Sequence, residues 1–190
     1  MEEHNFLEIE VKYDAGGIDR LAFKALANSL KPKSFLYIES KDVYYAKNEN
    51  EFLRHRNPPD FSEDKRSELT FKKKTAEGNN NIRVEINLRV DANTPEIVEA
   101  FCLGLGYTRN FTIVKYCDIF WYEKCDMVYY TVTDEEGKSS NYVEIEVLEN
   151  LNLSEEESWA VITEYEKLLA PLGITSRNRK RLSLWEMYRK

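Results

Sequence analysis

The stretch that decides the fold is FLEIEVKY at residues 6–13, in which apolar and charged side chains alternate. Successive side chains of a β-strand point to opposite faces, so this period of two residues predicts a strand with two unlike faces. One face is apolar, and the other carries Glu8, Glu10 and Lys12. A half-exposed sheet with its charged face toward water is the common origin of such a pattern. The other strands decide whether that explanation holds here.

Seven further segments have the alternation, or the β-branched and aromatic content, that is typical of strands. They cover residues 35–46, 51–56, 67–74, 82–90, 112–122, 127–133 and 142–148. Most of them follow one another through short connections, which favours antiparallel pairing. Together with residues 6–13 they make eight strands, a number that can close into a barrel.

Four helices are expected around these strands, at residues 18–30, 95–105, 154–170 and 179–188. Pro95 gives a start signal for the second, and Ser154 opens the third with a capping box. With 190 residues and no long linker, the chain is expected to form one α+β domain over residues 1–190.

The charges on the polar faces of the strands are sorted by sign. Carboxylates occupy the first and last strands and cations occupy strands between them, with Glu8, Glu10, Glu144 and Glu146 set against Arg54, Arg56, Lys72 and Lys74. Like charges side by side repel one another unless a counter-charge lies between them. A solvent-facing sheet usually mixes charges with Ser, Thr and Gln, so an ordinary exposed face fits the whole set poorly.

We therefore expect a barrel whose apolar side packs outward against helices and whose charged side lines a lumen. The lumen would hold the carboxylates Glu8, Glu10, Glu85, Glu144 and Glu146 and the cations Lys12, Arg54, Arg56, Lys72, Lys74, Arg83 and Lys115. Burying so much charge without a ligand is costly. Carboxylate ligands without His or Cys suit Mg²⁺ or Mn²⁺ rather than zinc. A polyphosphate with such a cation would satisfy both sets of charges.

The composition argues against several other classes of protein. There are 27 Lys and Arg against 34 Asp and Glu, and this net charge of -7 disfavours a general nucleic-acid binder. Three cysteines without a CxxC pair, and only two histidines, disfavour a disulfide scaffold and a zinc site. No stretch approaches the ~20 apolar residues of a membrane helix. The N-terminus lacks the features of a signal peptide, so a cytoplasmic protein is expected.

The charged strands also resemble a known family, the triphosphate tunnel metalloenzymes or CYTH superfamily. The signature of this family, ExExK, matches EIEVK at residues 8–12. Further matches keep the family's order along nearly the whole chain: DVYY at 42–45, LRHR at 53–56, LTFKKK at 69–74, RVE at 83–85, LGLGY at 103–107, Lys115, Asp134, YVEIE at 142–146 and SLWEM at 183–187. The family includes class IV adenylyl cyclases, thiamine triphosphatases and inorganic triphosphatases.

The resemblance implies an eight-stranded antiparallel tunnel in which carboxylates hold one or two divalent metals and cations grip a triphosphate. The expected metal ligands are Glu8, Glu10, Glu85, Asp134, Glu144 and Glu146. The expected substrate-binding residues are Lys12, Arg54, Arg56, Lys72, Lys74, Arg83 and Lys115, and the expected catalytic residues are Glu8, Glu10, Lys12 and Glu85. For Glu85 and Asp134, a salt bridge to a nearby Lys or Arg is an equal alternative.

Two departures from the family pattern leave the substrate open. Cys117 stands where the family often has the arginine of a Lys-x-Arg pair, and Ser139-Ser140 replaces a common Leu-Gly pair. Other reactive residues are expected to be structural: His55 faces away from the neighbouring arginines, and Cys102 lies on a helix, where it packs in the core.

The expected function is a metal-dependent phosphohydrolase that cleaves inorganic triphosphate or a nucleoside or other organic triphosphate. The alternative is a class IV adenylyl cyclase that makes cyclic AMP and pyrophosphate from ATP, because LGLGY followed by Lys115 is similar to the cyclase and thiamine triphosphatase branch. A non-catalytic binder of phosphorylated nucleotides is a second alternative. The expected partner is a small-molecule triphosphate, without nucleic acid or membrane, for a monomer or homodimer.

Overall fold

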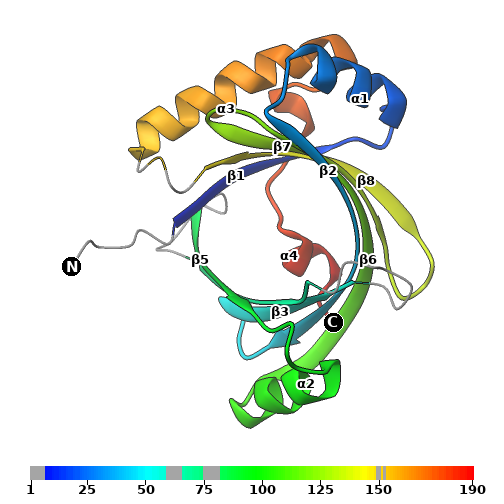
Figure 1. Cartoon of the computed structure of the whole chain (residues 1–190), viewed down its shortest axis with the longest axis vertical. Helices are drawn as coiled ribbons and strands as arrows, with labels where there is room; N and C mark the ends of the chain where they lie inside the picture. The colour runs from blue at the N-terminus through cyan, green and yellow to red at the C-terminus, as the bar shows by residue number, and fades with distance from the viewer. Residues whose placement is uncertain (1–6, 59–65, 75–81, 149–150, 152) are drawn as a thin grey trace.

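Eight antiparallel strands close into a barrel in the computed structural model, which describes residues 7–58, 66–74, 82–148, 151 and 153–190. The strands are β1 (Leu7–Asp14), β2 (Ser34–Ala46), β3 (Glu51–Asn57), β4 (Glu68–Lys74), β5 (Ile82–Arg89), β6 (Thr108–Trp121), β7 (Cys125–Thr133) and β8 (Ser139–Val147). Their order is β5-β4-β3-β2-β6-β7-β8-β1, and pairing of β5 with β1 closes the ring (Figure 1). The predicted α+β class and eight-stranded antiparallel barrel are confirmed.

Three helices cover the outside of the barrel, as the apolar outer faces require. Helices α1 (Arg20–Ser29) and α3 (Glu155–Leu169) lie on one side of the ring, and α2 (Pro95–Gly104) lies on the opposite side (Figure 1). Buried residues of α1 and α3 join the outer faces of β1, β7 and β8 in the largest apolar cluster. Buried residues of α2 join those of β2, β3 and β4 in another. Because these cores lie outside the wall, the inner face of the strands is left for charged side chains.

The C-terminal region differs from the expected helix over residues 179–188. Residues Arg179–Lys180 form a short strand, β9, that pairs with Tyr13 and Lys12 of β1. Helix α4 (Leu184–Tyr188) begins only after Ser183, whose hydroxyl accepts a hydrogen bond from the backbone N–H of Glu186 over 3.2 Å. The Ser-x-x-Glu capping box of residues 183–186 therefore sets the start of this helix.

Strand β6 also begins earlier than expected, at Thr108 rather than residue 112. Thr108 and Arg109 pair with Ala46 and Tyr45 of β2. The polar sequence of residues 108–110 hides this extension, because backbone pairing with β2 rather than side-chain alternation makes it a strand.

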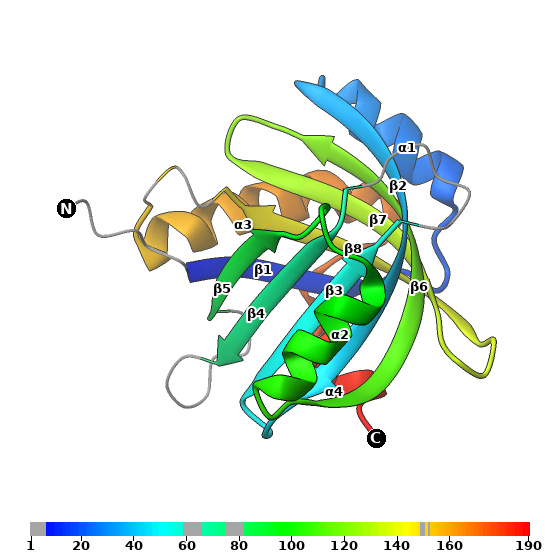
Figure 2. The ribbon, with the colours of Figure 1, turned by 60° about the horizontal axis from the view of Figure 1, so that its bottom comes forward.

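Helix α4 packs at one end of the barrel, against side chains that line the inner wall. Trp185 stacks on Phe52 and Phe111, with ring centroids 5.1 and 5.8 Å apart, and Phe111 stacks on Tyr44 at 4.3 Å. Leu184 joins the same cluster of buried residues. This end of the barrel, which we call the α4 end, is therefore filled by aromatic side chains; Figure 2 shows α4 beside β3, close to the C-terminus.

We expect Trp185→Ala to lower the free energy of unfolding by about 3 kcal/mol, because it removes a buried indole from this cluster. Urea denaturation followed by circular dichroism would measure the change. Leu182→Ala is the control, since Leu182 is 48% exposed and its truncation leaves no cavity. Equal stabilities of the two variants would contradict the packing role of Trp185.

Candidate active site in the barrel

A cavity of about 200 Å³ lies inside the barrel, and charged side chains dominate its lining. Among the described residues, seven carboxylates and six cations line it: Glu8, Glu10, Glu68, Glu85, Asp126, Glu144 and Glu146, with Lys12, Arg54, Arg56, Lys72, Arg83 and Lys115. All five carboxylates expected in the lumen lie there, with six of the seven expected cations. Glu68 and Asp126 were not anticipated from the sequence.

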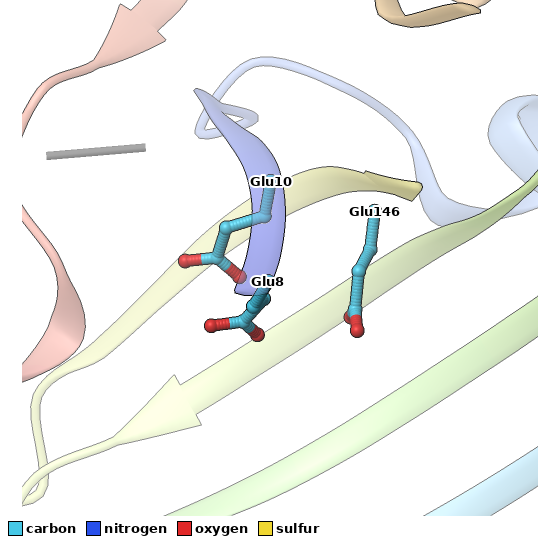
Figure 3. Close-up of side chains that lie close together, drawn as sticks. All are labelled: Glu8, Glu10 and Glu146. Carbon is cyan, nitrogen blue, oxygen red and sulfur yellow. The ribbon is translucent and has the colours of Figure 1, made fainter. Parts of the chain in front are cut away.

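Glu8, Glu10 and Glu146 come together on the inner wall, and we call them the acidic trio (Figure 3). One carboxylate oxygen from each lies within 4.8 Å of the others. The period of two residues places Glu8 and Glu10 on one face of β1, and the register of β1 with β8 sets Glu10 opposite Glu146. No other group of three His, Cys, Asp or Glu side chains this close occurs among the described residues.

Burial and repulsion from neighbouring carboxylates make Glu8 and Glu146 resist ionisation. Burial raises the pKa of Glu8 well above its usual range, and repulsion from Glu10 adds to the effect although Lys72 opposes it. Burial, followed by the charges of Glu85 and Glu10, raises the pKa of Glu146 to about 8. Three buried oxygen donors of this kind fit a hard divalent cation such as Mg²⁺ or Mn²⁺, whose charge would relieve the repulsion.

The cations of the cavity are engaged by these and neighbouring carboxylates. Lys72 donates hydrogen bonds of 2.8 and 2.7 Å to the two oxygens of Glu8 and forms a second ion pair with Glu85. Arg83 lies 3.6 Å from Glu10. Burial alone raises the pKa of Glu85, but attraction by Lys72 and Arg54 outweighs it and holds that pKa below its usual range. Glu85 is therefore an ionised partner of Lys72.

Glu144 lies in a second network beside the acidic trio. Its carboxylate lies 3.0 Å from Lys12 Nζ and accepts a 2.6 Å hydrogen bond from the hydroxyl of Tyr130. The ring of Tyr130 also packs against the ammonium group of Lys115, with 4.0 Å between Nζ and the ring centroid. Burial opposes ionisation, but Lys12 and Lys115 lower the pKa of Glu144 to about 2. The sequence does not predict this role of Tyr130, because a tyrosine in a strand rich in aromatic residues is ordinarily part of the hydrophobic core.

Asp42 fixes the orientation of Arg56 from the neighbouring position on strand β2. Arg56 donates two hydrogen bonds to the fully buried carboxylate of Asp42, over 3.0 and 2.9 Å. Burial raises the pKa of Asp42, but the guanidinium of Arg56 outweighs it and holds the pKa well below its usual range. Arg54 donates a 2.9 Å hydrogen bond to the Thr70 hydroxyl. Arg54 also lies 3.4 Å from a carboxylate oxygen of Glu68 and 3.9 Å from one of Glu85.

Two of the expected site residues lie apart from the cavity lining. Lys74 donates a 2.6 Å hydrogen bond to Glu186 and so ties β4 to α4. Asp134 lies in the turn between β7 and β8, where its carboxylate accepts hydrogen bonds from the backbone N–H groups of Glu136 and Lys138 over 3.0 and 2.9 Å. We therefore leave Asp134 out of the metal site proposed below.

The reactive side chains expected to be structural lie as predicted. His55 is buried on the outer face of β3, with its ring nitrogens 2.9 Å from the Ser67 hydroxyl and 3.2 Å from the Asn57 amide. Cys102 is fully buried in the α2 core. Cys117 lines the cavity, and burial raises the pKa of its thiol, so it is a poor nucleophile.

The burial of His55 predicts a pH-dependent loss of stability. Burial lowers the pKa of His55 to about 4, so between pH 6.5 and 4 the unfolded chain binds the proton that the folded chain refuses. The free energy of unfolding is therefore highest above pH 6.5 and decreases as the pH falls toward 4. Between pH 7.5 and pH 5, the free energy of unfolding of the wild type should fall by about 2 kcal/mol more than that of His55→Gln. Urea denaturation of both proteins at both pH values measures this difference. Equal decreases in the wild type and in His55→Gln would contradict the prediction.

Comparisons with known proteins place the fold. No model of a known protein family matches the chain, and no curated protein matches it in sequence. A conserved hypothetical protein of Pyrococcus furiosus has 26% identity and a TM-score of 0.75, over 94% of this chain and 98% of that one. A "putative adenylate cyclase" of Vibrio parahaemolyticus has 15% identity and a TM-score of 0.69, over 95% and 97%. The Mimivirus capping enzyme triphosphatase has 13% identity and a TM-score of 0.56, over 90% of each chain.

These likenesses confirm at the level of the fold the resemblance drawn from the sequence. The chain has a closed, eight-stranded antiparallel barrel and shares this fold with the "putative adenylate cyclase" and the capping enzyme triphosphatase. No helix of the described residues has the length and apolar character needed to span a membrane.

Proposed function

We propose that the protein is a metal-dependent phosphohydrolase that cleaves a triphosphate-containing substrate inside the barrel. The observation that carries the proposal is the acidic trio, whose carboxylates lie within 4.8 Å of one another in a cavity that six Lys and Arg residues also line. Carboxylates and cations in one closed space suit a substrate that arrives as a polyanion with a divalent cation.

In this proposal Glu8, Glu10 and Glu146 hold the divalent cation, which when bound supplies charge neutralisation for the phosphate oxygens. Phosphate binding falls to the cations that line the cavity, namely Lys12, Arg54, Arg56, Lys72, Arg83 and Lys115. Glu85 and Glu144 position Lys72 and Lys12 through the ion pairs described above. These two carboxylates thus orient cations rather than hold metal, which favours the salt-bridge alternative for Glu85.

An adenylyl cyclase is the second candidate, because two proteins described as a "putative adenylate cyclase" share the fold over almost the whole chain. Both reactions use the same polyanion site and differ in the nucleophile, which is water in the hydrolase and the ribose 3′-hydroxyl of ATP in the cyclase. A protein that only binds phosphorylated nucleotides would need neither nucleophile. The products therefore separate the three possibilities.

We expect purified protein with Mg²⁺ or Mn²⁺ to release orthophosphate from inorganic triphosphate or ATP. Phosphorus NMR and chromatography of the nucleotides would identify the products, with EDTA-treated protein as the control. Pyrophosphate together with cyclic AMP would instead establish the cyclase. Saturable binding without turnover of either compound would reduce the protein to a binder and overturn the proposal.

A further inference from the structure

Large apolar side chains gather on the outer surface of the barrel where helix α2 lies beside strands β4 and β5. Five of the eleven exposed large apolar side chains of the described residues lie here: Ile86, Leu88, Ile97, Phe101 and Leu105. Each of them leaves 42–56% of its surface exposed, although apolar residues of this size are ordinarily buried. Exposed apolar side chains gathered in one place mark a surface that contacts another molecule.

The strand part of this surface is the outer face of β4 and β5. Arg83 and Glu85 line the cavity, so the alternate residues Ile86 and Leu88 of β5 point outward. Phe71 of β4 lies opposite Ile86 in the register of the two strands and packs against the edge of the α2 core. Figure 2 shows β4 and β5 beside α2, and no helix of the described residues lies over them.

The helix part is the flank of α2 that faces these strands. Ile97, Phe101 and Leu105 recur every four residues, so they form one stripe along the helix and its C-cap. The opposite flank of α2 faces β6, because Glu99 forms an ion pair there with Arg109. The stripe therefore lies beside the outer face of β4 and β5. We call the five exposed residues of the helix and the strands the apolar step.

The charges that border the apolar step differ in sign between the helix and the strands. Helix α2 has two charged residues, Glu96 and Glu99, and no basic residue in its last turn. On the outer face of β4, Lys73 is exposed and has no ion-pair partner among the described residues. An acidic helix that packed on these strands would therefore bring negative charge toward an unpaired lysine. The helix of a second copy of this chain has that character.

From this arrangement we infer that the apolar step is the interface of a homodimer, in which α2 of each copy packs against β4 and β5 of the other. A two-fold axis makes the two contacts equivalent, because each copy offers one exposed helix stripe and one uncovered pair of strands. Both sets of apolar side chains then leave water together. The interface lies on the outside of the barrel, so the inference does not depend on the reaction proposed for the cavity.

Sedimentation equilibrium of the full chain tests the inference. We expect the wild type to have twice the 22.4 kDa mass of the chain, with a dissociation constant on the order of 1 µM. Leu88→Glu and Phe101→Arg should each raise this constant about a hundredfold or more, because each places a charge inside the apolar step. Lys73→Glu, at an exposed position, should raise it about tenfold, because it opposes two like charges. Leu21→Glu is the matched control and should remain dimeric, since Leu21 is 73% exposed on α1, across the barrel from α2.

A mixture of Leu88→Glu and Phe101→Arg tests which surfaces meet. In the mixed dimer one contact between helix and strands is native, and the other opposes the introduced glutamate and arginine. The mixture should therefore recover the dimer mass, while each variant alone is monomeric. Thermal unfolding checks that each variant is folded. A monomeric wild type at about 100 µM, a hundredfold above the expected constant, would overturn the inference. Dimers of either variant alone, or a mixture that stays monomeric, would show that other surfaces meet and would overturn it too.

Discussion

Replacement of both Glu8 and Glu10 by glutamine is expected to abolish divalent-dependent cleavage of triphosphate, with a loss on the order of a thousandfold or more in kcat/KM. The change keeps the shape of both side chains but removes two of the three carboxylates whose oxygens lie within 4.8 Å of one another. An amide oxygen is a much weaker ligand for Mg²⁺ or Mn²⁺ than a carboxylate. Release of orthophosphate over a range of Mg²⁺ concentrations measures the effect.

The same variant should remain folded, because it removes two buried carboxylates from a site where burial and repulsion from Glu10 raise the pKa of Glu8. We expect its thermal midpoint without metal to equal or exceed that of the wild type, and Mg²⁺ to stabilise it less. The paired control Glu49→Gln with Glu156→Gln removes two exposed carboxylates and should behave as the wild type does. Intact activity and metal dependence in Glu8→Gln/Glu10→Gln would show that the site lies elsewhere.

The barrel and most of the cavity lining could be predicted from the alternation of side chains. The period of two residues determines which face of its strand a side chain occupies. Glu8 and Glu10 therefore share one face of their strand, as Glu144 and Glu146 do of theirs. Closure of the sheet then brings faces from distant strands together. The opposition of Glu10 to Glu146, however, depends on the register of β1 with β8, which is set by backbone pairing that the sequence does not display.

The sequence does not predict the role of a residue, or predicts another role for it, where that role depends on a partner from another element of the fold. Asp42 stands in an aromatic run, and only the pairing of β2 with β3 sets it against Arg56. Asp126 follows a hairpin turn, where a carboxylate is ordinarily exposed. Lys74 shares the face of Lys72, but the expected helix over residues 179–188 concealed the capping box that brings Glu186 to it. Local pattern predicts the face of a residue, and tertiary pairing decides its partner.

Divalent metal is expected to increase the affinity for inorganic triphosphate about a hundredfold or more, because carboxylates of the cavity engage its cations until metal is bound. Its described lining has seven carboxylates for six cations. The sequence led us to expect five carboxylates and seven cations there. Lys72 is also occupied, with hydrogen bonds of 2.8 and 2.7 Å to Glu8. A cation bound by Glu8 would compete for that carboxylate and release the lysine for a phosphate oxygen.

Calorimetric titration of the wild type with inorganic triphosphate, in EDTA and in saturating Ca²⁺, measures this coupling. Linkage requires triphosphate to raise the affinity for Ca²⁺ by the same factor, which corresponds to about 2.7 kcal/mol for a hundredfold effect. Free triphosphate itself binds Ca²⁺, so Glu8→Gln/Glu10→Gln serves as the control in which that chelation persists and the coupling disappears. Equal affinities for triphosphate with and without metal would mean that the hydrogen bonds of Lys72 to Glu8 do not prevent Lys72 from binding a phosphate oxygen. A metal-dependent gain that persisted in the control variant would place the coupling outside the acidic trio.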